Sequence, residues 1–134
     1  MDLVSKRSEG KNIAYMSKIL IVEDESVMSD VQKDAFSRVG ILCDVAEDGV
    51  KALKFLKKND YNAIVMDIVM PHMDGLELLK QLQENPRWRK IPVIVLSNLS
   101  QESDRQECKR IGNCHYLLKT QTSLEVLVKV VKSL

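Results

Sequence analysis

The sequence predicts a single α/β domain in which a five-stranded parallel sheet is covered by helices on both faces. Five short apolar runs, rich in β-branched residues, alternate with stretches whose apolar residues recur at helical spacing. Alternation of this kind builds parallel sheets with right-handed crossover connections. Five such units suit the flavodoxin-like, doubly wound strand order 2-1-3-4-5 with five helices, and this is the fold class that we expect.

The expected strands are short, apolar and bounded by residues typical of turns. They correspond to residues 18–22, 41–45, 63–66, 92–96 and 115–118. Four of these runs lead directly into a polar residue, and those residues are Glu23, Asp67, Ser97 and Lys119. The carboxyl ends of parallel strands share one edge of a sheet, and ligands of such sheets bind there.

The expected helices have apolar residues three or four positions apart. They cover approximately residues 27–39, 48–57, 76–84, 101–111 and 124–131. Ser26 is expected to cap the first helix, and Gly40 to end it. The third helix should end at Asn85, because the residue before a proline avoids helical geometry.

The composition is that of an ordinary globular protein. The chain has 134 residues, of which 45% are hydrophobic and 29% charged, with a net charge of +1. This length suits one domain, which we expect at residues 18–134 after a polar N-terminal extension or tag at residues 1–17. The balanced charge gives no indication of nucleic-acid binding. The sequence shows no apolar run long enough for a membrane span and no apolar centre of a signal peptide in residues 1–16.

The cysteines give no signal of a structural or metal-binding role. Cys43, Cys108 and Cys114 are an odd number and lack CxxC or other ligand-type spacing. We therefore expect neither a disulfide framework nor a zinc site. A reducing, cytoplasmic location fits this pattern best.

Acidic, hydroxyl and amino groups follow the strands that should lie side by side in this sheet. Glu23 and Asp24 follow the first strand, Asp67 the third, Ser97 the fourth and Lys119 the fifth. Three carboxylates at one edge repel one another unless a cation lies among them. Ligation by oxygen alone, without histidine or cysteine, favours a hard cation, and Mg²⁺ is the ion that we expect.

The same edge suits phosphoryl transfer, which depends on charge neutralisation and in-line positioning more than on covalent work by the protein. Lys119 and Ser97 supply an ammonium and a hydroxyl, and Asp67 would be the nucleophile that forms an aspartyl phosphate. Taken alone, Asp67 is explained equally well as a turn residue, and Glu23 and Asp24 as charges that favour the start of a helix. Only the combination at one edge favours the phosphoryl site.

These strand ends resemble those of the receiver domains of two-component response regulators, typified by the chemotaxis regulator. The resemblance runs from about Lys18 to Leu134. In that family an acidic pair ends the first strand, and the phospho-acceptor aspartate ends the third and is followed by Met-Pro-x-Met-Asp-Gly. A Ser or Thr ends the fourth strand, and a lysine ends the fifth, three residues after an aromatic switch residue. The matching residues are Glu23 and Asp24, Asp67, residues 70–75, Ser97, Lys119 and Tyr116.

The resemblance implies that a histidine kinase, a histidine phosphotransferase or a small phosphodonor transfers a phosphoryl group to Asp67. Asp24, Asp67 and the backbone carbonyl of Val69 would bind Mg²⁺ directly, and Glu23 would assist through water. Lys119 would pair with the phosphoryl group.

The resemblance also implies a conformational switch. Ser97 would move to hydrogen-bond a phosphoryl oxygen, and Tyr116 would rotate into the space that it leaves. The face formed by the fourth helix, fifth strand and fifth helix would report the change to a downstream protein or to a second copy of the chain in a homodimer. On this basis we expect a stand-alone phospho-acceptor and not an enzyme that acts on other substrates.

Two positions depart from the family pattern. Thr120 follows Lys119 where the family usually has a cis proline, so we expect a trans peptide bond there. Asn98 stands where a small residue usually follows Ser97. These departures leave open a degenerate receiver that acts only as an interaction platform.

The remaining alternative is a Mg²⁺-dependent phosphatase on a similar sheet. Such enzymes often use an Asp-x-Asp pair, and the segment from Asp67 to Val69 lacks the second aspartate. A dinucleotide-binding module is disfavoured because the first strand meets acidic residues in place of a glycine-rich turn.

Overall fold

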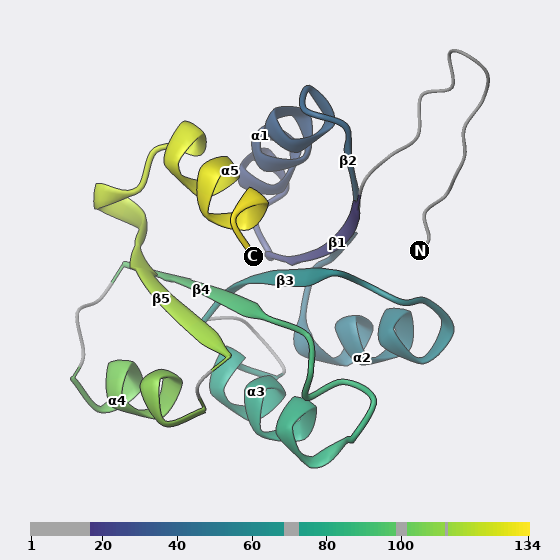
Figure 1. Ribbon diagram of the computed structural model, residues 1–134, viewed down its shortest axis with the longest axis vertical. Helices are drawn as coiled ribbons and strands as arrows, with labels where there is room; N and C mark the ends of the chain where they lie inside the picture. Colours follow the sequence, from purple (N-terminus) through teal and green to yellow (C-terminus); the bar gives the residue numbers. More distant parts are fainter. Residues whose placement is uncertain (1–16, 69–72, 99–101, 112) are drawn as a thin grey trace.

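The strand order of the sheet is the one that the sequence predicts. The structure is a computed structural model that describes residues 17–68, 73–98, 102–111 and 113–134. Within these residues a five-stranded, wholly parallel sheet has the order β2-β1-β3-β4-β5 (Figure 1). Its strands are β1 (Ser17–Val22), β2 (Ile41–Ala46), β3 (Ala63–Asp67), β4 (Val93–Ser97) and β5 (Cys114–Leu118). The first strand therefore begins one residue before its expected start.

The helices lie on both faces of this sheet. Figure 1 shows two of them on one face, α1 (Ser26–Ser37) and α5 (Leu124–Lys132). The opposite face carries α2 (Gly49–Lys58), α3 (Gly75–Glu84) and α4 (Glu102–Ile111). A short 3₁₀ turn, Lys119–Gln121, connects β5 to α5. In the described ranges, no helix combines the length and apolar character needed to cross a membrane.

Each face of the sheet has its own apolar core. Phe36 of α1 and Leu127 of α5 pack on one face, together with strand residues such as Ile21. Leu56 of α2 and Leu79 of α3 pack on the other face. A fully buried side chain of this size contributes about 2 kcal/mol to folding, so the two cores together hold the strands in a fixed register.

The strand register brings the predicted polar residues to one edge. Val22 of β1 is paired with Met66 of β3, so Glu23 and Asp67 lie at the same level. Asp67 is in turn paired with Leu96 of β4, directly before Ser97. Ser97 is paired with Leu118 of β5, the residue directly before Lys119.

The N-terminal caps of the helices agree only in part with the sequence. Asp74 accepts a hydrogen bond from the N–H of Glu77 at 2.9 Å and so begins α3. The expectation that Ser26 caps α1 is wrong, because Ser26 is the first helical residue and Glu25 is the cap, without a side-chain hydrogen bond. The side chain of Glu25 therefore does not stabilise this helix start in the way that Asp74 does.

The expectation that the cysteines form no disulfide is also wrong. Cys108 of α4 and Cys114 of β5 are joined by a disulfide bond, while Cys43 is a buried free thiol. A chain with one disulfide-bonded pair and one free cysteine has an odd number of cysteines. The parity of the cysteines therefore could not exclude a disulfide.

Gly75 has a steric role beside the end of β3. A Cβ atom at this position would lie 2.6 Å from Cα of Ile68 and 3.0 Å from the carbonyl oxygen of Asp67. The Gly75 N–H also donates a hydrogen bond to the Ile68 carbonyl at 2.9 Å. The start of α3 thus approaches the backbone that carries Asp67 more closely than any side chain allows.

Gly75→Ala is expected to lower the free energy of unfolding by about 2 kcal/mol, because the backbone of Ile68 must shift to accommodate the methyl group. Urea denaturation measures this loss. Gly49→Ala is the comparison variant, since Gly49 also begins a helix after an aspartate cap, but the atoms nearest its added Cβ, at 2.9 Å, belong to the side chain of Met73 and not to the backbone of β3, so a smaller loss is expected. Equal losses in the two variants would contradict the steric role of Gly75.

Candidate functional site

Asp67 occupies the last position of β3, at the carboxyl edge of the sheet. Its strand is central, with β1 on one side and β4 on the other. The apolar residues before it are buried in both cores, so the strand is held rigidly up to the carboxylate. The side chain of Asp67 is only 12% exposed. A carboxylate held in this way is positioned by the fold and not by a mobile loop.

Lys119 connects two of the acidic side chains at this edge. Its ammonium nitrogen lies 2.8 Å from Oδ2 of Asp67 and 3.2 Å from Oε1 of Glu23. All three side chains are largely buried, with exposures of 12% for Lys119, 12% for Asp67 and 2% for Glu23. The attraction between charges shielded from water in this way is stronger than at the surface, although the loss of hydration offsets part of it. Removing one partner of such a pair is costly because the other charge stays buried.

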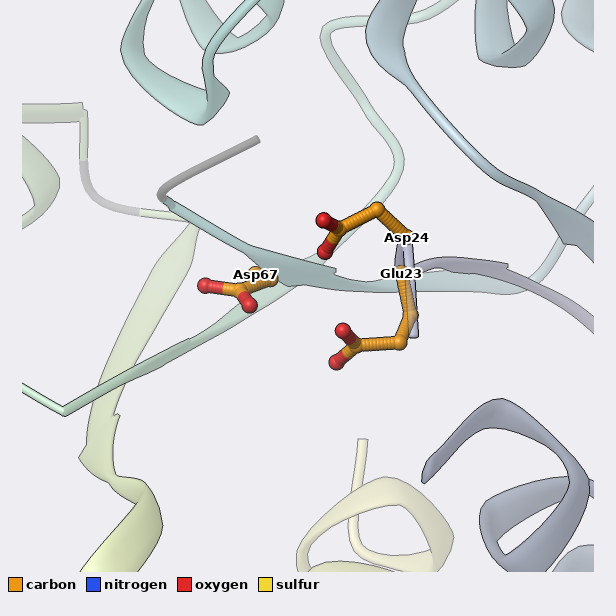
Figure 2. A group of neighbouring side chains, drawn as sticks. All are labelled: Glu23, Asp24 and Asp67. Atoms are coloured by element: carbon orange, nitrogen blue, oxygen red, sulfur yellow. The ribbon is translucent and has the colours of Figure 1, made fainter. Parts of the chain in front are cut away.

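Asp24 completes a cluster of three carboxylates. One oxygen from each of Glu23, Asp24 and Asp67 lies within 4.8 Å of the others. Figure 2 shows Glu23 and Asp24 extending from the end of β1 and Asp67 from β3, with all three carboxyl groups directed to the same side. Asp24 is exposed, whereas Glu23 is buried, so the cluster opens to solvent at Asp24.

The pKa values of Glu23 and Lys119 are both raised above their ordinary values. Burial raises the pKa of Glu23 above its ordinary value, although the Glu25 N–H at 3.2 Å and the charge of Lys119 act in the opposite direction. Burial lowers the pKa of Lys119, but its hydrogen bond to Asp67 and the charges of Asp67 and Glu23 outweigh burial and raise the pKa overall. The lysine is therefore held in its charged form, and it favours the charged form of Glu23.

Ser97 and Tyr116 lie where the sequence analysis expects them. Ser97 ends β4 and is completely buried, one residue beyond the partner of Asp67 in the sheet. Tyr116 is in the middle of β5 and is partly buried against the core between the sheet and the helices α2, α3 and α4. The structure thus brings Glu23, Asp24, Asp67, Ser97 and Lys119 to one edge, with Tyr116 three residues before Lys119.

The remaining predictions concern the loops around the site. Val69, whose carbonyl is predicted to bind a metal, lies outside the described residues, as do residues 70–72 of the family motif. None of the described peptide bonds is cis, so the bond between Lys119 and Thr120 is trans, as expected. Lys119 reaches Asp67 without a cis bond at this position. Asn98 is exposed to solvent.

One contact near the site is not evident from the sequence. The guanidinium carbon of Arg105 in α4 lies 4.7 Å from the centre of the Tyr116 ring, a distance typical of a cation–π contact. Helical spacing alone does not show which polar residue of α4 faces β5. Only the packing of the helix on the strand identifies Arg105 as the partner.

The donor set of this edge fits a hard divalent cation. Its three carboxylates offer only oxygen, and the cluster has no cysteine or histidine ligand among the described residues. The single ammonium of Lys119 balances only part of their negative charge. Such a site can hold a divalent cation and can stabilise the negative oxygens of a bound phosphoryl group.

Comparisons with known proteins agree with this geometry. A family model described as the response regulator receiver domain matches residues 19–132. The chain is 32% identical to the chemotaxis protein CheY-3 of Vibrio cholerae over 86% of its own length and 89% of that protein. It is 30% identical to a gliding motility regulatory protein of Myxococcus xanthus over 87% of its own length, but it spans only 15% of that larger protein.

Two solved structures are similar in fold and in sequence. The receiver domain of a Francisella response regulator is 34% identical, with a TM-score of 0.79 over 87% of this chain and 94% of that chain. The receiver domain of a sensor histidine kinase from Pseudomonas aeruginosa is 25% identical, with a TM-score of 0.76 over 87% and 95% of the two chains. That second structure has a magnesium ion coordinated in its active-site cleft.

Lys119→Met is expected to lower the free energy of unfolding by about 2 kcal/mol at pH 7 in the presence of a chelator, because it leaves Glu23 and Asp67 without their shared cation. The deficit should shrink as the pH falls towards 5. Glu23 already has a raised pKa, and it would take up a proton more readily in the folded variant than in the unfolded chain.

Urea denaturation at several pH values measures both effects. Lys51→Met removes a solvent-exposed pair with Glu47 and serves as the matched control, with an expected change of less than about 0.5 kcal/mol. A loss for Lys119→Met that grows as the pH falls would contradict the assigned role of the lysine.

Proposed function

This chain belongs to the response regulator receiver domain family, and we propose that it accepts a phosphoryl group on Asp67 in a two-component phosphorelay. The observation that carries this proposal is the position of the Asp67 carboxylate. It lies 2.8 Å from the Lys119 ammonium and within 4.8 Å of carboxylate oxygens of Glu23 and Asp24. A nucleophile, a cation and two further anionic ligands thus meet at one edge of the sheet.

Mg²⁺ is the cofactor that this donor set favours. Asp24 and Asp67 would hold it, together with the backbone carbonyl of Val69, which is predicted from the sequence alone, and Glu23 would assist through water. When bound, Mg²⁺ neutralises negative charge on the phosphoryl oxygens. The magnesium ion in the similar receiver domain from Pseudomonas aeruginosa supports this assignment.

The protein side chains account for the rest of the reaction. A carboxylate oxygen of Asp67 attacks the phosphorus of a phosphohistidine, the N–P bond breaks, and the imidazole of the donor leaves. Lys119 is close enough to Asp67 to pair with the transferred phosphoryl group. Ser97 lies one residue beyond the strand partner of Asp67, and its hydroxyl would hydrogen-bond a phosphoryl oxygen.

Transfer of the phosphoryl group would change the face formed by α4, β5 and α5. Movement of Ser97 towards the phosphoryl group would leave space for Tyr116, which now lies under Arg105 of α4. The rotated tyrosine would alter the surface that binds a downstream protein or a second copy of the chain. Phosphorylation acts in this way when a local charge change favours one of two conformations.

Two observations, one from the sequence and one from the structure, weigh against the alternatives. A phosphatase of the Asp-x-Asp type needs a second aspartate two residues after Asp67, and Val69 occupies that position. A platform that only binds partners would not need Lys119 to be buried with Asp67 and Glu23. We therefore propose a phospho-acceptor, not an enzyme acting on other substrates, that works in the cytoplasm with a histidine kinase or histidine phosphotransferase.

Incubation with acetyl phosphate and Mg²⁺ should add one phosphoryl group to the wild-type chain, detected as a mass increase of the intact protein. Asp67→Asn should abolish the increase, and a chelator should reduce it strongly. Asp60→Asn is the control, because the Asp60 side chain is 91% exposed and lies before the amino end of β3. Phosphorylation of Asp67→Asn at the wild-type rate would refute the assignment, and steady turnover of a phosphomonoester would favour the phosphatase.

The phosphohistidine donor must contact the surface beside Asp67, and Val27 is a candidate for that contact. Val27 is 75% exposed at the start of α1, three residues after Asp24, and it borders a depression of about 350 Å³ together with Met28 and Val31. An apolar side chain with this exposure gains free energy when a partner covers it.

Val27→Ser is expected to slow transfer from a phosphorylated histidine phosphotransferase by about 5-fold. The rate with acetyl phosphate should stay within about 2-fold, because the small donor needs no docking surface. Val39→Ser removes a 40% exposed valine beyond the other end of α1 and should leave both rates unchanged. Equal slowing with both donors would show that Val27 affects the reaction site and not docking.

A further inference from the structure

The disulfide between Cys108 and Cys114 lies away from the carboxylate cluster. Cys114 is the first residue of β5, whereas Lys119 follows the carboxyl end of that strand. The two Cα atoms are 5.2 Å apart, within the usual range for a disulfide. None of the steps proposed for phosphoryl transfer uses this bond, so its role needs a separate explanation.

The disulfide joins two elements that also meet at Tyr116. Cys114 and Tyr116 are two residues apart on β5 and therefore point to the same face of the strand. Both pack against the core that contains Cys108. Arg105, three residues before Cys108 in α4, lies over the Tyr116 ring. Helix α4 is thus attached to β5 at two neighbouring points, and only the disulfide depends on redox conditions.

We propose that Cys108 and Cys114 are a reversible oxidation site, at which a small-molecule disulfide converts the two thiols into a bond that clamps α4 to β5. The pair would be reduced in a reducing compartment and would close when the ratio of oxidised to reduced small thiols rises. Nothing in this step requires a phosphoryl group or a metal ion.

The exposure of the two cysteines assigns their roles in the exchange. Cys114 is partly exposed, and its thiolate attacks one sulfur of the small disulfide, forming a mixed disulfide and releasing one small thiolate. Cys108 is 2% exposed and does not meet the small disulfide itself, but it lies beside Cys114. Its thiolate then attacks the adjacent Cys114 sulfur and releases the second small thiolate. The protein loses two protons and two electrons, and the small disulfide is reduced to two thiols.

Cys43 provides an internal control for this chemistry. It is 8% exposed and lies in β2, in the core on the opposite face of the sheet. Burial raises the pKa of its thiol to about 12, so the reactive thiolate is scarce at neutral pH. Unlike Cys108, Cys43 is a free thiol in the core on the other face of the sheet and has no neighbouring mixed disulfide to attack, so it should remain a thiol under conditions that oxidise the other two cysteines.

The test is thiol mapping of the purified full chain in glutathione buffers that range from reducing to oxidising. After acid quenching, the protein is unfolded and alkylated with a maleimide, and the labelled peptides are identified by mass spectrometry. Labelling of Cys108 and Cys114 should disappear together as the buffer becomes more oxidising, while Cys43 stays labelled. Independent loss at the two positions, or full labelling in the most oxidising buffer, would overturn the proposal.

Two single variants test the order of the exchange. Cys108→Ser should accumulate a glutathione adduct on Cys114, because no second thiol is present to release it. Cys114→Ser should remain without an adduct at Cys108, because that thiol is buried. A glutathione adduct that forms on Cys108 as fast as on Cys114 would contradict the assigned roles.

Hydrogen exchange tests the clamp itself. Reduction should speed amide exchange in α4 roughly 10-fold and leave α1, on the other face of the sheet, unchanged. The double variant Cys108→Ser, Cys114→Ser should exchange like the reduced protein in both buffers. Identical exchange of α4 in oxidised and reduced wild-type protein would exclude a clamp, and this result would leave the phosphorylation proposal unaffected.

Discussion

The rest of the site depends on how the fold brings mutually repelling carboxylates together. Glu23, Asp24 and Asp67 have oxygens within 4.8 Å of one another, at the edge where β1 and β3 end. The ammonium of Lys119 relieves part of this repulsion, since it contacts Asp67 at 2.8 Å and Glu23 at 3.2 Å. The two apolar cores supply the free energy that holds the strands, and therefore the charges, in this arrangement.

The two ends of β5 make different contacts. Its carboxyl end delivers Lys119 to the cluster, and its amino end is attached to α4 through Cys114. Tyr116 lies between them, in contact with Arg105 of α4. A change at either end of the strand can therefore reach the same part of the surface. This arrangement provides a physical route by which phosphoryl transfer and oxidation could act on one face of the protein.

The fold and the members of the site followed from the sequence because strand ends in a parallel sheet share an edge. This rule predicts that Asp67, Ser97 and Lys119 lie at one edge, and the structure confirms their positions. The rule on strand ends does not predict contacts that depend on the direction of a side chain. The second bond of Lys119 to Glu23, and the choice of Arg105 in α4 as the partner of Tyr116, arise from packing. The sequence does not predict the disulfide, because the spacing of Cys108 and Cys114 is uninformative until α4 is placed on β5.

Paramagnetic relaxation by Mn²⁺ shows directly whether one hard cation binds among these carboxylates. Mn²⁺ shares the preference of Mg²⁺ for oxygen ligands and broadens the NMR signals of nearby amides. Substoichiometric Mn²⁺ should broaden the amides of Asp24, Ile68 and Lys119 and leave those of Asn62 and Val93, at the opposite edge of the sheet, sharp. Broadening centred on the acidic start of α4, or spread evenly over the surface, would contradict the account.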